Sequence, residues 1–456
     1  MSENPQFEVT DDRMSSFHWT AIGICVVLNM LDGFDILVMA FTANSVSAEW
    51  QLSASQLGLL LSAGLLGMAL GALLLAPWGD RIGRRKLVIS CLVIATVGMI
   101  LAGFAQDEVQ LGLVRVLTGF GVGGLLSCTN VLASEYASPR WRGLAVSLQT
   151  TGFTIGATIG GLAAVVMIDN WGWRSVFFVG ATLSLLSLIL VIWRLPESIE
   201  FLITKGGAGA LDRINALARR MGQQPLATLP ARQSVSDAPT RGRFLALLSQ
   251  PYRRATLTLW ILFLIMLFTY YFVTSWSPKL LVQAGMSQNS GLTGGVLLNI
   301  GGVIGTLLFG FLSARFSVAR VLAAATLFAA ILLTVFPATL STMWVALLAG
   351  LLMGLCISGC IAGLLATAAL VYPTATRATG VGSAIGIGRA GAILSPLIVG
   401  RLIDAGWTST ELYIAAGTLM LVAVAAALTL RIGQQPPATG PTATSDPDHH
   451  SVPANP

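Results

Sequence analysis

Twelve long apolar runs dominate this chain and decide what it can fold into. Each has roughly 18 to 25 residues, enough for a helix to cross the hydrocarbon core of a bilayer. Only 10% of the residues are charged and the mean hydropathy is +0.78, whereas a soluble domain carries about 25% charged residues. A helix satisfies its own backbone hydrogen bonds in lipid, so the sequence predicts an all-α integral membrane protein. The runs lie at 18–43, 55–78, 87–105, 109–133, 142–167, 173–194, 255–282, 291–313, 319–339, 343–371, 379–403 and 411–431.

The runs fall into two groups of six, separated by a polar stretch. Lys and Arg are concentrated in the even-numbered connections and in this central stretch, which the positive-inside rule places in the cytoplasm. We therefore expect both termini to be cytoplasmic. The predicted parts are an N-terminal segment (1–17), a first six-helix half (18–195), a cytoplasmic central loop (196–254), a second half (255–431) and a disordered Pro/Thr/Ser-rich tail (432–456).

A short internal repeat links the two groups. SAGLLGMALGALLLAPWGDR (62–81) and NIGGVIGTLLFGFLSAR (299–315) align so that Gly67 meets Gly301 and Gly71 meets Gly305. Small residues four apart let helices approach closely in lipid. The repeat predicts two pseudo-symmetric six-helix halves with a site between them near the midplane.

Two acids lie inside the first run, in NMLDGFDILVMA. Asp32 and Asp35 are three residues apart and share a helix face. Each charge at the centre of a membrane helix costs about 2.5 to 3.5 kcal/mol, and mutual repulsion and burial both disfavour the ionised form. Arg115 in the fourth run would favour it. The pattern predicts proton coupling by Asp32, Asp35 and Arg115; the alternative is a permanent bridge between runs one and four. Either aspartate can carry the proton, or the pair can titrate together.

A second buried arginine and several ring side chains suggest a ligand site. Arg389 has no acid in its own run, and a substrate carboxylate would be a bidentate partner; the alternative is an arginine that snorkels or bonds to backbone carbonyls. Aromatic rings in FTYYFVTSWSPKLL could stack on a substrate ring or form an interfacial belt. Intramembrane amides could reach the substrate or bond between helices. The candidate substrate-binding residues are Arg389, Arg115, Tyr270, Tyr271, Trp276 and Asn299.

APWGDRIGRRK (76–86) resembles the loop between spans two and three of the major facilitator superfamily. The resemblance implies that this loop latches the two halves on the cytoplasmic side. The alternative is that its basic residues only keep the loop inside. This sequence departs from the family pattern at Ala76, where glycine is usual, and at Ala314, where the second-half copy would carry an acid. The implied gate residues are Asp80, Arg81, Gly83, Arg84 and Arg85.

Asp-Gly-Phe-Asp at 32–35, with Arg115 in RVLTGFGVGG and Arg389 in GIGRAGAILSP, is similar to the aromatic acid:proton symporter group of that superfamily. The resemblance implies a monomeric carrier that imports benzoate-like anions with protons across the bacterial inner membrane by alternating access. It implies no cofactor. Two alternatives stay open: an exporter of aromatic or drug-like compounds driven by proton exchange, and a membrane sensor that binds aromatic acids without moving them.

Other classes of protein are disfavoured by the residues. GFGVGG (119–124) matches a nucleotide-binding pattern, but it lies within an apolar helix and follows no strand. The five cysteines all fall in apolar runs, which excludes a disulfide framework. The net charge of +6 reflects the cytoplasmic connections and indicates no nucleic-acid partner. We expect no enzyme activity and no metal site, and we expect a small aromatic carboxylate, protons and lipid as partners.

Overall fold

The computed structural model describes residues 14–138, 140–206, 209–222, 225–226, 228, 247–250, 252–372 and 374–430. Within its helices, the side chains of Asp80, Thr374, Ala375 and Ala378 are not described. The predicted tail (432–456), most of the N-terminal segment and much of the central loop lie outside the described residues.

Twelve described helices are long and apolar enough to cross a membrane. They confirm the predicted fold class. The first helix continues seven residues past its predicted end, because its polar last turns find partners in neighbouring helices, and it ends where Gln51 adopts a left-handed conformation. The spanning helices are α1 (Ser16–Trp50), α2 (Ala54–Ile82), α3 (Arg84–Gly103), α4 (Glu108–Glu135), α5 (Arg142–Trp171), α6 (Arg174–Arg194), α10 (Arg253–Gln283), α11 (Gln288–Arg315), α12 (Val318–Thr339), α13 (Met343–Val371), α14 (Thr374–Asp404) and α15 (Ser409–Thr429).

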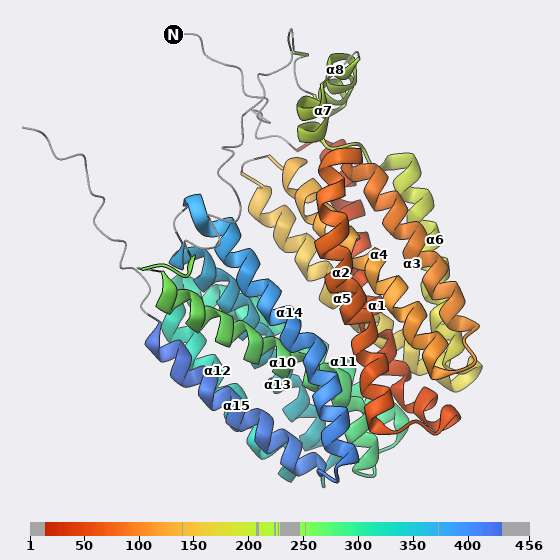
Figure 1. Ribbon diagram of the computed structural model, residues 1–456, viewed down its shortest axis with the longest axis vertical. Coiled ribbons are helices and arrows are strands. Elements are labelled where there is room, and N and C mark those ends of the chain that lie inside the picture. Colours follow the sequence, from red (N-terminus) through yellow and green to blue (C-terminus); the bar gives the residue numbers. More distant parts are fainter. Residues whose placement is uncertain are drawn as a thin grey trace, which may run out of the picture.

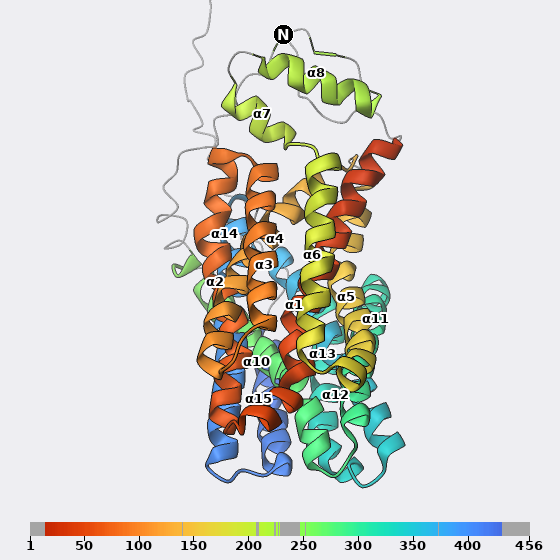
Figure 2. The same ribbon diagram turned by 90° about the vertical axis from the view of Figure 1, so that its right-hand side faces the viewer.

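The central loop contains two short helices that were not predicted from the sequence. In α7 (Ile199–Lys205), the Ser198 hydroxyl caps the helix by accepting from the Phe201 amide at 3.1 Å. In α8 (Ala210–Met221), Ile214 and Ala218 are buried along one face. Both helices lie beyond one end of the first bundle (Figure 2). We call this end, where α1 begins and α15 stops, the loop end.

The two halves repeat one packing arrangement, with α1–α6 in one bundle and α10–α15 in the other (Figure 1). Gly67 and Gly71 of α2 lie against backbone oxygens of α4, with no room for a Cβ. Gly301 and Gly305 of α11 lie in the same way against α13. The glycines paired by the sequence repeat therefore occupy equivalent positions in the two halves.

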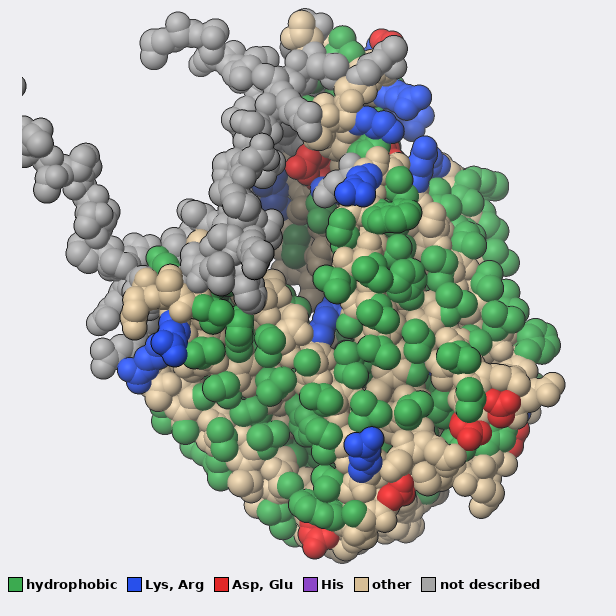
Figure 3. Space-filling model, viewed as in Figure 1, with side chains coloured by type: hydrophobic (Ala, Val, Ile, Leu, Met, Phe, Trp, Pro, Cys, Tyr) green, Lys and Arg blue, Asp and Glu red, His purple; other side chains and the backbone are tan. Residues whose placement is uncertain are grey.

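The halves meet at the end opposite the loop end and separate towards it. Among described residues, every hydrogen bond between the halves involves the part of the helices nearer the opposite end. The space-filling view shows a hollow between the halves on the loop side (Figure 3). The protein is thus in a state whose central cleft opens to the loop end. The bonded pairs are Ser45–Gln288, Ser47–Lys279, Ala54–Asp404, Ser55–Asp404, Ser62–Ile393 and Asp169–Asn289.

Candidate functional site

Asp35 and Arg115 form a buried ion pair between α1 and α4. Arg115 Nη1 donates to Asp35 Oδ1 at 2.7 Å, and Nη2 donates to the Asp35 carbonyl at 2.7 Å. The arginine is only 1% exposed. Gly64 of α2 makes room for the guanidinium, because a Cβ there would lie 3.2 Å from Nη2. Charge-assisted bonds of this kind are stronger than neutral ones and hold both groups in place.

A small cavity lies beside this ion pair. It is lined by Asp35, Arg115 and residues of α2 and α4 that include Gly64, Met68 and Gly119, and its volume is about 10 Å³. That is room for about one water molecule. The pair is therefore next to a space that could hold a proton-carrying water.

Asp32 is buried without the partner that Asp35 has. Asp32 is 2% exposed, and neither of its carboxylate oxygens has a hydrogen-bond partner among the described residues. A buried carboxylate in this situation is costly when ionised. It interacts electrostatically with Arg389 of the second half. The structure thus separates the two aspartates into a paired one and an unpaired one.

Arg389 on α14 is a charged residue of the second half that, like Asp32, has a buried side-chain atom without a hydrogen-bond partner among the described residues. It is partly buried, and its Nη1 is buried without an acceptor among the described residues. It interacts electrostatically with Asp32 and with Tyr271. A guanidinium never loses its proton in proteins, so this position is a fixed positive charge facing the interface between the halves.

The predicted aromatic residues divide into two groups. Tyr270 and Tyr271 of α10 form an edge-to-face pair with ring centroids 5.2 Å apart. They pack in a cluster that includes Leu65 of α2 and Val122 of α4, so they lie where the halves meet. Trp276 is fully buried nearer the opposite end, and its Nε1 has no acceptor among the described residues. Side chains of an interfacial belt face lipid, so burial of Tyr271 and Trp276 argues against that alternative.

Asn299 lies on α11, and its side-chain amide is hydrogen-bonded within that helix. Its Nδ2 donates to the Gly295 carbonyl of the same helix at 2.9 Å, and the residue is buried. The structure therefore shows a helix-internal bond for this side chain. Its contribution to a substrate site stays a prediction.

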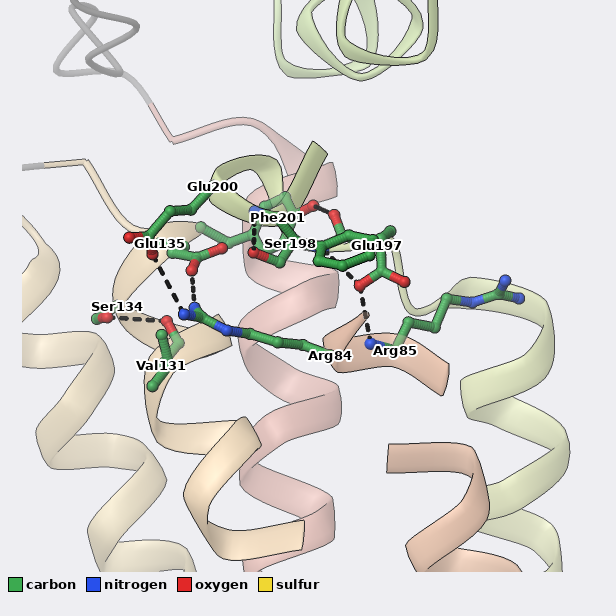
Figure 4. A network of polar contacts seen from close by, with 10 residues as sticks. Arg84, Arg85, Val131, Ser134, Glu135, Glu197, Ser198, Glu200 and Phe201 are labelled. Atoms are coloured by element: carbon green, nitrogen blue, oxygen red, sulfur yellow. Dashed lines mark hydrogen bonds and ion pairs between the residues drawn. The ribbon is translucent and has the colours of Figure 1, made fainter. Parts of the chain in front are cut away.

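The loop that carries the predicted gate residues is tied into the first half (Figure 4). Arg84 pairs with Glu135 at the end of α4 and with Glu200 of α7, the latter at 3.2 Å. The Arg85 amide donates to Glu197 Oε1 at 2.9 Å. All these partners belong to α1–α6, to α7 or to the segment 195–198 that joins α6 to α7. In this open state the described contacts of Arg84 and Arg85 therefore hold the first half together and do not reach the second.

Gly83 is the position where this loop requires glycine. Its φ is +105°, and a Cβ would lie 2.5 Å from Glu197 Oε2. Burial raises the pKa of the nearby Tyr136 phenol, which keeps it a donor, and its hydroxyl donates to the Glu197 carbonyl at 2.5 Å. Arg81 is exposed, and the side chain of Asp80 lies outside the described part of the chain.

Several partners of the gate residues and one contact between the halves were not predictable from the sequence. Glu135, Glu197 and Glu200 lie in polar connections, and nothing in their spacing indicated which basic residue they would meet. Asp404, at the end of α14, accepts from the Ala54 amide at 2.9 Å and from the Ser55 amide at 2.8 Å. These amides begin α2, where free N–H groups and the helix dipole favour a negative charge.

No group of three His, Cys, Asp or Glu side chains that could hold a metal ion occurs among the described residues. The chemistry that this arrangement offers is binding of an anion and transfer of protons. It brings one unpaired acid and one arginine from opposite halves to a common interface.

Comparison with known proteins gives consistent matches along the chain. The family model described as "Major Facilitator Superfamily" matches residues 22–307 and 295–454. A gallate transporter from Pseudomonas putida is 34% identical over 425 residues, covering 92% of this chain and 93% of that protein. The 4-hydroxybenzoate transporter PcaK from Acinetobacter baylyi is 32% identical, covering 94% of each. A solved structure of the xylose transporter XylE from E. coli superposes with a TM-score of 0.70 at 18% identity, covering 91% of this chain and 97% of that one.

Proposed function

The chain belongs to the Major Facilitator Superfamily, and from this premise we propose that it is a proton-coupled symporter for a benzoate-like aromatic carboxylate. It is a transporter and not an enzyme. We place it in the bacterial inner membrane as a monomer that imports its substrate, with the loop end and both termini in the cytoplasm. The Lys and Arg residues of the loop-end connections support this orientation.

One observation carries the proposal: among the described residues, Asp32 and Arg389 are intramembrane charges without a hydrogen-bonded partner, and they interact electrostatically from opposite halves. Asp35 is already paired with Arg115. The unpaired acid is therefore suited to take up a proton, and the unpaired arginine to hold a carboxylate in a bidentate contact. The names of the relatives, which are transporters of gallate and 4-hydroxybenzoate, support an aromatic acid as the substrate.

In the proposed cycle, the site loads from outside with a proton on Asp32 and the substrate carboxylate on Arg389. Tyr270 and Tyr271 of α10 stack against the aromatic ring of the substrate, and Trp276 and Asn299 line the rest of the site. The halves then rock to the state described above, in which the cleft opens to the loop end. Release of substrate and proton leaves Asp32 to interact with Arg389 during the return.

Arg115 and Asp35 remain paired with each other throughout this cycle, and their pairing decides which aspartate carries the proton. Asp35 lies one helical turn from Asp32 and is occupied by Arg115, so Asp32 is the aspartate left free to take up the proton. If more than one proton accompanied a monovalent anion, the membrane potential would add about 2.3 kcal/mol per charge for each 100 mV. When the loop end closes, Asp80, Arg81, Gly83, Arg84 and Arg85 are proposed to form contacts with the second half.

Uptake measurements test the proposal directly. Radiolabelled benzoate, 4-hydroxybenzoate, protocatechuate and muconate would be offered to a transporter-deficient bacterium expressing the chain, with and without an uncoupler. We expect uncoupler-sensitive uptake that is abolished in Asp32→Asn and Arg389→Ala. Asp107→Asn is the matched control, because Asp107 caps α4 and asparagine caps a helix equally well.

The outcomes separate the alternatives. Faster loss of preloaded compound in energised cells would indicate the exporter. Binding without uptake or counterflow would indicate the sensor. Uptake that is insensitive to the uncoupler, or unchanged in Asp32→Asn, would remove proton coupling from the proposal.

A further inference from the structure

Two buried side-chain amides near Asp32 each leave an oxygen without a donor. Asn29 on α1 is 4% exposed and Gln149 on α5 is 1% exposed. Asn29 Oδ1 and Gln149 Oε1 have no hydrogen-bond partner among the described residues. Buried polar atoms are nearly always paired in native proteins. Two such atoms on residues that are hydrogen-bonded to each other therefore indicate that a bound molecule supplies the donors.

The neighbouring bonds decide which atom of each amide is the oxygen. Asn29 Nδ2 donates to the backbone carbonyl of Gln149 at 2.5 Å, and a flipped amide would set two acceptors against each other. Gln149 Nε2 donates to Thr129 Oγ1 at 3.4 Å. The Thr129 hydroxyl in turn donates to the Leu126 carbonyl at 3.2 Å, so it accepts from the glutamine. The two atoms left over are therefore acceptors.

The Asn29 acceptor lies on the face of α1 that is directed at the second half, and Gln149 is its hydrogen-bonded neighbour on α5. Asn29, Asp32 and Ile36 follow one another at spacings of three and four residues and share a face of α1. Ile36 packs against the cluster that contains Tyr271 and Ala392 of the second half. Acceptors from the first half thus lie on one side of the interface, and the unpaired donor of Arg389 lies on the other.

We propose that Asn29 and Gln149 form a hydroxyl-binding subsite that selects aromatic acids with a ring hydroxyl meta or para to the carboxylate. This rests on the proposed function, because it takes Arg389 as the carboxylate anchor. With the carboxylate held there, a meta or para hydroxyl projects towards the first half and donates to Asn29 Oδ1 or Gln149 Oε1. An ortho hydroxyl stays beside the carboxylate and bonds to it internally. Benzoate leaves both acceptors unpaired.

Equilibrium binding to the purified full-length protein tests this subsite with benzoate and with 2-, 3- and 4-hydroxybenzoate. One neutral hydrogen bond corresponds to about a 2- to 12-fold change in affinity. We expect 3- or 4-hydroxybenzoate to bind about tenfold more tightly than benzoate, and 2-hydroxybenzoate to bind like benzoate. In Gln149→Met and Asn29→Leu, the preference for the hydroxylated acid over benzoate should fall to about twofold or less.

Two further variants separate a binding role from a structural one. Thr96→Val removes a buried hydrogen bond to Ser184 between α3 and α6, away from the interface, and should leave the preference intact. Gln149→Glu retains an acceptor oxygen, and the Thr129 hydroxyl can turn to donate to its second oxygen, so this variant should keep more of the preference than Gln149→Met. The ratio of affinities is measured within one variant, so it does not depend on the amount of folded protein.

Equal affinities for benzoate and for all three hydroxybenzoates in the unaltered protein would overturn the subsite alone. An unchanged preference in both Gln149→Met and Asn29→Leu would do the same. If none of the acids binds, or if Arg389→Ala binds them all as well as the unaltered protein does, the proposed function fails and the subsite fails with it.

Discussion

Substitution of Asp404 should shift the protein away from the state in which the cleft opens to the loop end. This carboxylate is at the end of α14 and accepts from the first two amides of α2, at 2.9 and 2.8 Å. Among the described acidic residues of the second half, Asp404 is the one that forms hydrogen bonds with the first half. These bonds can exist only while the opposite ends of the halves are together, so they stabilise that state relative to the one in which these ends separate.

The size of the effect follows from the exposure of the group. Asp404 is solvent-exposed, so its attraction to the start of α2 is screened and is worth about 0.3 to 1 kcal/mol. Loss of the cap adds a contribution that brings the total to about 1 kcal/mol. Asp404→Ala should therefore change the ratio of the two states by about fivefold.

Distance measurements between spin labels at the opposite end would report this ratio. Cysteines introduced at Gln106 in the first half and Ser341 in the second are suitable positions, since both residues are exposed. The five native cysteines are buried, which favours selective labelling. We expect a population with longer distances to grow in Asp404→Ala.

Glu411→Ala is the matched control for this experiment. Its carboxylate also lies at the opposite end and also caps a helix, but it accepts from Thr408 of its own half at 2.7 and 2.9 Å. The distance distribution should stay unchanged in this variant. An identical distribution in Asp404→Ala and the unaltered protein, or an equal shift in Glu411→Ala, would refute the reasoning.

Three further predictions concern the buried charges and the gate loop. Asp35→Asn should lower the free energy of unfolding by about 3 to 5 kcal/mol, because it leaves Arg115 buried without its counter-ion; thermal unfolding would check this, and a loss below about 1 kcal/mol would contradict it. Asp32→Asn should fold normally and still exchange substrate in counterflow while losing uncoupler-sensitive uptake; loss of both activities would argue against a role in proton coupling alone. Gly83→Ala should destabilise the protein by about 1 to 3 kcal/mol more than Gly406→Ala, since both have positive φ but only the former meets a neighbouring side chain; equal melting temperatures would contradict this.

Hydropathy alone was sufficient to predict the spanning helices, because lipid leaves a backbone no other way to satisfy its hydrogen bonds. The repeat around Gly67 and Gly301 likewise predicted equivalent packing in the two halves, since close approach of helices depends on small residues at fixed spacing. The intramembrane charges could also be recognised from the sequence, because their cost in lipid makes them exceptional wherever they occur. These are local properties of the chain.

The pairing of those charges was decided only by the tertiary structure. Asp32 and Asp35 are equivalent in spacing and surroundings along the sequence, yet only Asp35 reaches Arg115, 80 residues away. The bond from the Ala54 amide to Asp404 joins residues 350 apart, and Asn29 meets Gln149 across 120 residues. Such contacts depend on how helices rotate and cross in three dimensions, which a pattern of hydrophobic and polar residues does not specify. The sequence determined which groups must find partners in the membrane, and the packing of the helices determined which of them remain free to bind a proton and a substrate.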